Sequence, residues 1–414
     1  MRAELLTIGS ELTSGSTLNT NATYLARRLG EVGIPCQRQI TVGDERDSLV
    51  GALRDAFTHC DLLITTGGLG PTFDDVTVEA IAEVTQRPLQ MVPSVAAKIH
   101  RFYTRRHRTL QRAALRQAQL PRGGVALPNP IGTAPGLWLQ LPTTLIVALP
   151  GVPGEMRAIM ERSVLPRLKR LKNRTAIESV TLRTVGIVEL SIEELLRTLR
   201  IPSGVQVGLY PHLRAVDVRV SASGSSSTAA RTRIAQVAAP LRRALGIAVY
   251  GTGEETLEAV VGTLLVKRHQ TLAIAESCTG GLVSDRITDV PGSSRYLRGA
   301  IVAYHNDLKR ECLKVPERML GQFGAVSAQV AKAMAQGVRQ FAGADIGLSI
   351  TGVAGPTGGT PSKPVGLVHI GLADARRVQG LRCQFFGDRD AIKTQAAQTA
   401  LDWLRRYLLA RARR

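Results

Sequence analysis

The residues best suited to chemistry lie in a short segment of the last third of the chain. Residues 271–281 read TLAIAESCTGG, which predicts a strand, a turn and the start of a helix. The small residues of such a turn let backbone N–H groups approach a ligand, and the amino end of a helix favours an anion. Ser277, Cys278 and Thr279 are therefore candidates for a nucleophile or a phosphate cradle. The alternative is a tight strand-to-helix turn that ends in an N-cap.

Further candidate residues follow in order along the chain. The stretch DVPGSSRYLRGAIVAYHNDLKREC carries a serine pair, Tyr304 at a predicted strand end and Lys309 just beyond it. Residues 348–359, LSITGVAGPTGG, form a second glycine-rich loop after a buried strand. Arg389 lies at a predicted helix start, where a guanidinium can clamp phosphate or carboxylate with two hydrogen bonds. Each piece alone is a weak signal, and together, in this order, they are a strong one.

The motifs ESCTGG, PGSS, AYHNDLK, GAVS, TGVAGP, KPVG and GDRDA resemble, in this order, the nicotinamide-nucleotide amidohydrolase domain of the CinA family. The resemblance covers residues 256–409. It implies hydrolysis of nicotinamide mononucleotide to nicotinate mononucleotide and ammonia, with no cofactor. It also implies that Ser294 is the nucleophile, with Tyr304 and Lys309 as its partners, ahead of Ser277 and Cys278. The substrate-binding residues that we expect are Ser277, Thr279, Gly280, Thr351, Gly352, Gly355 and Arg389.

A lysine partner suits a serine nucleophile, because a free hydroxyl needs an adjacent base to attack. His305 follows Tyr304 on a predicted strand, so its side chain should point to the opposite face. A lysine can act as the base if its pKa is lowered by several units. The two candidate causes are burial of Lys309 and the positive charges of Arg298 and Arg310.

The first part of the chain carries a different signature. Residues 64–77, ITTGGLGPTFDDVT, together with IGSELTSG, NPIGTAPG and LPGVPGEM, resemble the molybdopterin-binding-like domain that opens full-length CinA proteins. The resemblance implies a metal-dependent ADP-ribose pyrophosphatase, with Asp44, Asp74 and Asp75 as candidate ligands of a divalent cation through hard oxygen atoms. Phe73 departs from the family pattern, in which a histidine often precedes the two aspartates. The alternative role of the paired aspartates is helix capping. Backbone N–H groups of the glycine run can cradle phosphate, and the nucleotide-binding residues that we expect are Gly67, Gly68, Gly70 and Thr133.

These motifs need elements to position them, and the pattern of apolar runs predicts a three-domain α/β protein. Residues 1–173 alternate strand and helix signals, which is typical of a mostly parallel sheet with ligands at its carboxyl edge. Residues 174–250 contain short strands with alternating apolar and polar positions and two helices, and resemble a KH-like α+β module. This module lacks the G-x-x-G loop that grips nucleic acid, so we interpret it as a spacer or dimerisation element. Residues 251–414 alternate strand and helix again and form the deamidase domain.

Composition narrows the class of protein. The 414 residues carry a net charge of +20, and arginine clusters in three basic runs. These runs lack the interleaved aromatics that stack on bases, so solvated helix faces are favoured over a nucleic-acid partner. Five scattered cysteines without a CxxC pair, and the lack of an apolar run of about 18 residues, indicate a reduced cytoplasmic protein without a membrane span. We expect a homodimer that acts on small nucleotides, nicotinamide mononucleotide and ADP-ribose. The alternatives are a molybdopterin-binding protein and a DNA-associated competence or recombination factor.

Overall fold

The computed structural model describes residues 1–107, 109–171 and 176–410. The chain divides into two compact units, one formed by Met1–Glu178 with Ala222–Arg231 and the other by Ser179–Ser221 with Thr232–Arg414. The predicted mixed α/β class with several sheets is confirmed. The predicted boundaries 1–173, 174–250 and 251–414 stay predictions, and the first boundary, at residues 173 and 174, lies outside the described residues.

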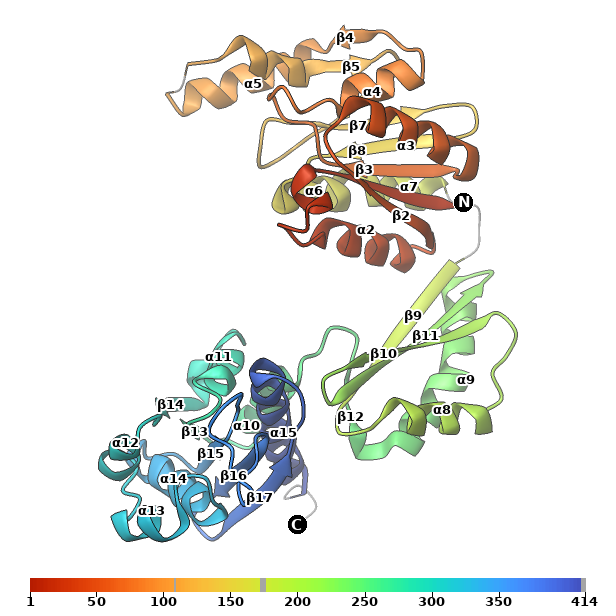
Figure 1. Cartoon of the computed structure of the whole chain (residues 1–414). Helices are drawn as coiled ribbons and strands as arrows, with labels where there is room; N and C mark the ends of the chain where they lie inside the picture. Colours follow the sequence, from red (N-terminus) through yellow and green to blue (C-terminus); the bar gives the residue numbers. More distant parts are fainter. Residues whose placement is uncertain (108, 172–175, 411–414) are drawn as a thin grey trace. The chain divides into compact units, whose positions relative to one another are not determined.

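The amino-terminal sheet has six strands in the order β2-β1-β3-β8-β7-β6 (Figure 1). Four of them, from β2 to β8, are parallel, whereas β7 and β6 are antiparallel additions. All side chains of β3 and β8 are buried, as expected for central parallel strands covered on both faces. The strands are β1 (Ala3–Ile8), β2 (Cys36–Val42), β3 (Leu62–Thr66), β6 (Val125–Leu127), β7 (Gly136–Gln140) and β8 (Leu145–Leu149), and a separate pair is formed by β4 (Leu89–Met91) and β5 (Gln119–Pro121).

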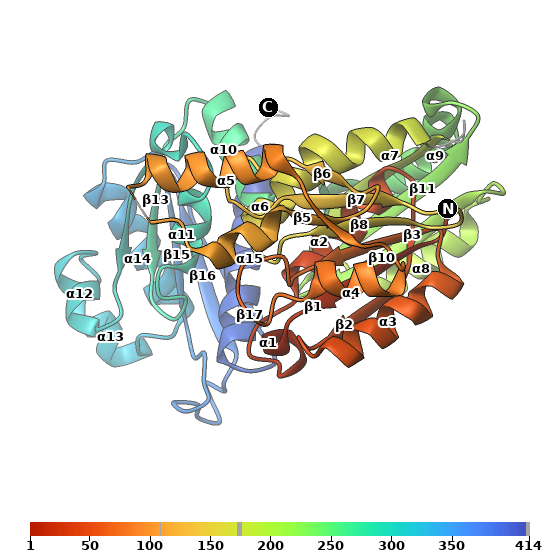
Figure 2. The ribbon, with the colours of Figure 1, turned by 90° about the horizontal axis from the view of Figure 1, so that it is seen from above.

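Helices cover both faces of this sheet. Helices α2, α6 and α7 pack through Leu25, Leu29, Met156 and Leu168 against one face. Helices α3 and α4, which lie side by side in Figures 1 and 2, pack through residues such as Leu53 against the other. The helices of this part are α1 (Ser10–Thr13), α2 (Thr20–Glu31), α3 (Arg46–His59), α4 (Thr77–Val84), α5 (Pro93–Arg105), α6 (Pro153–Ile159) and α7 (Leu165–Leu171).

A four-stranded sheet, β10-β11-β9-β12, follows in the chain. Strand β11 alternates buried and partly exposed positions along much of its length, as a strand with one solvated face does. The hydrophobic core beside this sheet contains Leu182, Ile192, Val218 and Leu241. The elements are β9 (Ala176–Thr184), α8 (Glu189–Thr198), β10 (Val205–His212), β11 (Ala215–Gly224), α9 (Ser227–Leu245) and β12 (Val249–Thr252).

The last sheet has the order β14-β13-β15-β16-β17 (Figure 1). Strands β14, β13 and β15 are parallel, so their carboxyl ends meet at one edge of the sheet. Strands β16 and β17 are antiparallel, and β14 and β17 are the edge strands. The strands are β13 (Leu272–Glu276), β14 (Leu297–Val302), β15 (Ile346–Gly352), β16 (Leu367–Ala373) and β17 (Val378–Gln384).

Helices α10, α11 and α15 cover one face of this sheet, and α14 covers the other. Helix α14 begins at its N-cap Ser327, whose hydroxyl accepts a hydrogen bond from the N–H of Val330. The helices are α10 (Leu257–Lys267), α11 (Leu282–Thr288), α12 (Asn306–Glu311), α13 (Glu317–Phe323), α14 (Ala328–Phe341) and α15 (Arg389–Ala410), and the 3₁₀ helix η4 spans Ser293–Arg295.

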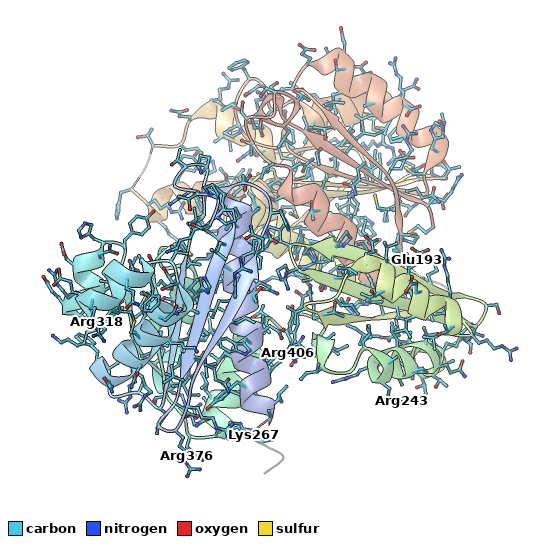
Figure 3. The ribbon with its side chains drawn as sticks, turned by 60° about the horizontal axis from the view of Figure 1, so that its bottom comes forward. Glu193, Arg243, Lys267, Arg318, Arg376 and Arg406 are labelled. Atoms are coloured by element: carbon cyan, nitrogen blue, oxygen red, sulfur yellow. The ribbon has the colours of Figure 1, made fainter. Side chains whose placement is uncertain are left out.

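Many of the charged side chains lie on the surface. Arg243, Lys267, Arg318 and Arg376 are exposed and are labelled in Figure 3. Within the described residues, we find no helix that is both long enough and apolar enough to span a lipid bilayer.

Candidate active site

A cavity of about 350 Å³ lies at the carboxyl edge of β13, β14 and β15. Its volume is within the usual range for small-molecule sites. It brings together eight of the sequence-predicted residues, most of them from segments at or after the carboxyl ends of β13, β14 and β15, because parallel strands deliver their following loops to the same edge. These eight are Ser277, Cys278, Tyr304, Lys309, Thr351, Gly352, Gly355 and Arg389.

Lys309 of α12 is the most deeply buried ionisable residue of this cavity, with only 1% of its surface exposed. Its Nζ donates to the carbonyl oxygens of Ala303, at 2.7 Å, and Tyr304, at 3.1 Å. A neutral amine has two N–H groups and one lone pair. Both N–H groups can go to these carbonyls, which leaves the lone pair for a proton donor in the cavity. The contacts therefore suit a lysine that acts as a base.

Burial lowers the pKa of Lys309 from its ordinary value, because an ammonium loses hydration when it leaves water. Of the two causes that the sequence suggested, burial is confirmed. The charges of Arg298 and Arg310 do not contribute to this shift. Arg310 instead pairs with Asp307 at 3.1 Å, and Arg298 helps to lower the pKa of the Asp345 carboxyl.

Arg389 is the first residue of α15, and its guanidinium contacts two parts of the cavity lining. One guanidinium nitrogen donates to the Tyr304 hydroxyl at 2.7 Å, and another donates to the carbonyl of Gly355 at 2.7 Å. Tyr304 itself is 59% exposed. A phosphate or carboxylate that enters the cavity would meet a guanidinium already held in place, as bidentate recognition requires.

Because a Lys cannot reproduce two directed contacts, we expect Arg389→Lys to raise the KM for a phosphorylated substrate roughly tenfold or more. The effect on kcat should be smaller if Arg389 binds ground state and transition state alike. Steady-state kinetics of this variant would test it, with Arg382→Lys on the exposed edge strand β17 as the matched control. An unchanged KM would remove Arg389 from the binding site.

The turn after β13 differs from the expected phosphate cradle. The buried Glu276 carboxylate accepts hydrogen bonds from the N–H groups of Gly281, Val283 and Ser284, at 2.8–3.1 Å. The amino end of α11 is therefore already occupied by a carboxylate of the same chain, which makes binding of a substrate anion there less favourable. Thr279 and Gly280, both expected to bind substrate, are not among the described residues that line the cavity.

Two nucleophile candidates of this turn do line the cavity, and they differ in chemistry. Burial raises the pKa of the Cys278 thiol to about 12, so almost no thiolate forms at neutral pH. Ser277 is 9% exposed and lines the cavity together with Lys309. Cys278 is thus a packed apolar residue, whereas Ser277 remains a candidate.

Ser294 is not among the described residues that line this cavity. It lies in η4, directly before β14, whereas Tyr304 and Lys309 follow the carboxyl end of that strand. The six residues of β14 separate the two ends by roughly 20 Å at about 3.3 Å per residue. The structure therefore brings Tyr304 and Lys309 together but does not bring Ser294 of the same chain to them.

His305 does not extend the strand as expected, because β14 ends at Val302. His305 is instead the N-cap of α12, and its Nδ1 accepts a hydrogen bond from the N–H of Asp307. The next residue, Asn306, lines the cavity and was missed at the sequence level. Its position within the AYHNDLK motif was the available signal.

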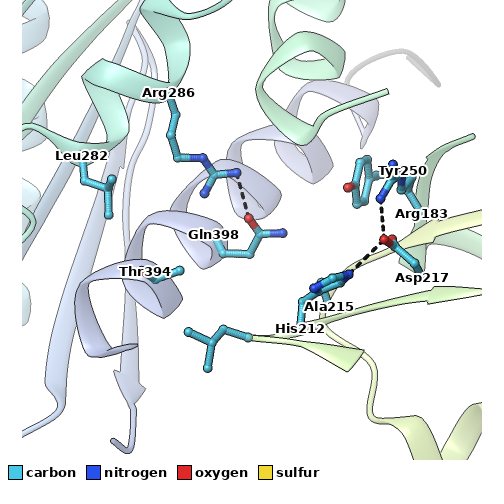
Figure 4. A pocket seen from close by; sticks show the side chains of 10 residues that line it. Arg183, His212, Ala215, Asp217, Tyr250, Leu282, Arg286, Thr394 and Gln398 are labelled. Atoms are coloured by element: carbon cyan, nitrogen blue, oxygen red, sulfur yellow. Dashed lines mark hydrogen bonds and ion pairs between the residues drawn. The ribbon is translucent and has the colours of Figure 1, made fainter. Parts of the chain in front are cut away.

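A second cavity, of about 500 Å³, is larger but less suited to catalysis (Figure 4). Its charged groups already have partners, since the Asp217 carboxylate accepts from Arg183 and lies 3.0 Å from His212 Nε2. Arg286 donates to Glu258 and Gln398 at 2.8 and 2.9 Å. None of the sequence-predicted site residues lines this cavity.

The glycine run at Gly67, Gly68 and Gly70 forms a turn in which there is little room for side chains, as the sequence predicts. Gly67 and Gly68 have positive φ angles, and a Cβ on Gly67 would lie 2.1 Å from the Ile8 carbonyl oxygen. A Cβ on Gly70 would lie 2.2 Å from Asp75 Oδ2. Thr133 lies in the bend after the Asn129–Gly132 loop, where the Asn129 side chain accepts from the N–H of Gly132.

The three aspartates do not form a ligand cluster with one another. Asp75 Oδ2 accepts from the backbone N–H of Thr72 at 2.9 Å, and Asp44 Oδ2 accepts from the N–H of Ser10 at 2.8 Å. Asp74 is exposed. Helix α4 has no side-chain cap, so the alternative of helix capping is wrong for Asp75, which stabilises the preceding turn. Among the described residues no group of three or more His, Cys, Asp or Glu could hold a metal ion.

A basic cavity of about 500 Å³ lies beside the Asn129–Gly132 loop. Burial and the charge of Arg101 lower the pKa of Lys98, whose Nζ donates to the carbonyl of Asn129. The sequence predicts a solvated helix face for this arginine run. Part of the run instead lines a concave surface, whose cationic residues are Lys98, Arg101, Arg105 and Arg106.

Three protein-family models match the chain. Residues 254–408 match a model described as the CinA C-terminal domain. Residues 4–170 match a probable molybdopterin binding domain, and residues 179–251 match the KH domain of the damage-inducible protein CinA.

Similar proteins cover nearly the whole chain. A CinA-like protein of Salinibacter ruber is 45% identical over 411 residues, covering 99% of this chain and all of the relative. A putative competence-damage inducible protein of Halothermothrix orenii is 42% identical over 409 residues, covering 99% of both chains. Among solved structures, a CinA protein of Thermoplasma acidophilum is 35% identical, covering 40% of this chain and 98% of its own, with a TM-score of 0.37.

Proposed function

This chain belongs to the CinA family, and from that premise we propose that residues 251–414 hydrolyse the carboxamide of nicotinamide mononucleotide to nicotinate mononucleotide and ammonia. The observation that carries the proposal is the buried Lys309 in the carboxyl-edge cavity, because burial lowers its pKa and so raises the share of the free amine that can act as a base. The preset guanidinium of Arg389 in the same cavity suits the phosphate of the mononucleotide.

The proposed reaction has two steps. A serine Oγ attacks the carboxamide carbon and passes its proton to Lys309 Nζ. The tetrahedral intermediate collapses, the C–N bond breaks, and the nitrogen leaves as ammonia with the proton from Lys309. Water then attacks the resulting ester, again with Lys309 as base, and releases the carboxylate and the serine. Tyr304, held by Arg389, orients the reacting groups or relays the proton.

Two serines compete for the role of nucleophile. The family resemblance assigns the role to Ser294. Ser294 is not among the described residues that line the cavity, whereas Ser277 is. Because a serine must lie within hydrogen-bond reach of its base, we propose Ser277 as the nucleophile in place of Ser294.

The test of the proposal is ammonia release from nicotinamide mononucleotide by the pure protein, with product analysis for nicotinate mononucleotide. Absence of both products would refute it. Three relatives carry names that refer to competence and damage induction. The alternative of a DNA-associated factor predicts duplex binding that weakens steeply with salt. Salt-dependent DNA binding without ammonia release would favour that alternative.

A second candidate function concerns the amino-terminal part of the chain, where we propose cleavage of the pyrophosphate bond of ADP-ribose. The basic cavity beside the Asn129–Gly132 loop supports it, because its cations can attract a pyrophosphate. The expectation of a divalent metal rests on the family resemblance alone, since the described residues contain no group of three or more His, Cys, Asp or Glu side chains that could hold one. We derive no step through such an ion.

Asp75→Asn is expected to abolish ADP-ribose cleavage and to leave deamidation unchanged. An amide keeps the acceptor for the Thr72 N–H, so the turn should persist while the charge is lost. Product analysis with and without a chelator would measure the effect, and Asp47→Asn, at an exposed position of α3, is the matched control. Full cleavage by Asp75→Asn would leave Asp75 with only its role in the turn.

A further inference from the structure

The second cavity, of about 500 Å³, has no part in the proposed reaction (Figure 4). All the residues that line it belong to the second compact unit, and they come from the four-stranded sheet and from helices α11 and α15. We propose that this cavity binds a small uncharged heteroaromatic ring that carries a carbonyl group, and that the bound ring is an effector of the deamidase. The effector role rests on the proposed deamidation, whereas the binding site does not.

The sheet side of the cavity is the face that helices α8 and α9 do not cover. Val216 and Val218 of β11 pack into the core with these helices, so Asp217 between them points to the opposite face. Arg183 of β9 and His212 of β10 line the cavity on the same side. Asp217 is only 6% exposed, and its carboxylate accepts from Arg183 and lies 3.0 Å from His212 Nε2. The cavity therefore has a buried, already ordered polar wall.

The charges at the cavity are matched within the chain. Arg183 pairs with Asp217 on the sheet side, and Arg286 of α11 donates to Glu258 at 2.8 Å on the helix side. A charged ligand would lose its hydration on entry without meeting an unmatched opposite charge, which is unfavourable. An uncharged ligand does not have this penalty.

Free hydrogen-bond donors face the cavity from both sides. Gln398 is 9% exposed, and its Oε1 accepts from Arg286 at 2.9 Å, while its Nε2 has no partner among the described residues. The hydroxyls of Tyr250 and Thr394 also have no partner in the described part of the chain. Burial and the charge of Asp217 raise the pKa of Tyr250, so its hydroxyl keeps its proton and can donate. These donors suit carbonyl and ring-nitrogen acceptors.

Apolar side chains complete the lining. Leu213, which is 46% exposed, and Leu282 at the start of α11 offer surface for the faces of a ring. The volume lies in the usual range for small-molecule sites. Pyridine carboxamides and lactam nucleobases share the required chemistry, which is a flat uncharged ring with a carbonyl acceptor.

The cavity lies against the two helices that carry active-site groups at their amino ends. Helix α15 begins at Arg389, and Thr394 is five residues further along the same helix. Helix α11 follows the turn that contains Ser277. The hydrogen bond between Arg286 and Gln398 joins the two helices directly. A ligand that contacts this pair therefore acts on the elements that position the nucleophile and the guanidinium of the active site.

Calorimetric titration of the full-length protein with nicotinamide and with inosine tests the binding site. The wild type should bind at least one of the two, and nicotinate, which carries a charge, should bind more weakly than nicotinamide. Tyr250→Phe and Gln398→Leu should each weaken binding roughly tenfold, because each removes a donor and keeps the approximate shape of the side chain. Binding of neither probe would overturn the proposal.

The matched control is Thr399→Val, also on α15, because the Thr399 hydroxyl donates to the carbonyl of Gln395. Its affinity for the probe should equal that of the wild type, whereas Thr394→Val should weaken binding. Thermal melts show that the variants fold, and Tyr250→Phe removes a single oxygen that has no partner among the described residues. Binding that is lost in Arg389→Ala and kept in Gln398→Leu would place the ring in the active-site cavity and overturn the proposal.

Kinetics test the effector role separately. A saturating concentration of the bound probe should change the KM for nicotinamide mononucleotide at least about fivefold, and Gln398→Leu should remove this change. Binding with unchanged kinetics would overturn the effector role. Binding to a protein that releases no ammonia would refute the deamidase and keep the site, whereas ammonia release without binding would keep the deamidase and overturn the site.

Discussion

Lys309→Arg is expected to lower the rate of deamidation by at least about a hundredfold, which is the usual contribution of a positioned general base. Arginine keeps the positive charge but does not lose its proton at any pH that the protein survives. The side chain of Lys309 is buried against the carbonyls of Ala303 and Tyr304, so the variant replaces the one amine found among the described residues that line the cavity. Turnover of nicotinamide mononucleotide under saturating substrate measures the loss.

Control variants separate loss of the base from loss of structure. Lys309→Met has a similar shape, has no charge and should be as inactive as Lys309→Arg. A thermal melt of both variants near that of the wild type shows that the fold persists. Near-normal turnover of Lys309→Arg would mean that the residue supplies only charge, and the base would have to lie elsewhere.

The pH profile of kcat provides an independent check of the same base. The folded-state pKa of Lys309 is lowered by burial, from the value of about 10.4 of an unperturbed lysine. The free amine is the active form, so the rate should be low at acid pH, rise through the lowered pKa, and then level off. A rate that falls over the same interval would contradict a lysine base.

Ser277→Ala is expected to reduce deamidation by roughly 10³-fold or more, because covalent attack is lost when the nucleophile is removed. Binding of the mononucleotide should persist, since Arg389 and the loop after β15 remain in the cavity. Rapid mixing with substrate would separate the two effects, and the wild type should show an early burst of ammonia if breakdown of the ester limits turnover.

Ser294→Ala is the matched comparison, because Ser294 is not among the described residues that line the cavity. It should leave the rate of deamidation close to that of the wild type. The reverse pattern, with Ser294→Ala inactive and Ser277→Ala active, would place the nucleophile in η4, as the family resemblance implies.

Much of the arrangement followed from the sequence. The buried central strands β13 and β15 were predicted from their apolar runs, and strand polarity placed their following loops at one edge. The edge strand β17 was missed, because its side chains are mostly exposed and it has no continuous apolar run. The carboxyl end of β14 was predicted too far along the chain. The strand ends at Val302, whereas the sequence pattern placed Tyr304 and His305 on it.

The sequence by itself determined the family and the residue types that meet at the carboxyl edge, because motifs directly after parallel strands converge there whatever the packing. Only the tertiary structure decided how these residues can act. Burial of Lys309 depends on how α12 packs, and capping of α11 by Glu276 depends on a turn in three dimensions. The separation of Ser294 from Lys309 has the same origin: fifteen residues apart in the sequence, they lie at the two ends of one extended strand, and extended backbone converts short sequence separation into long distance.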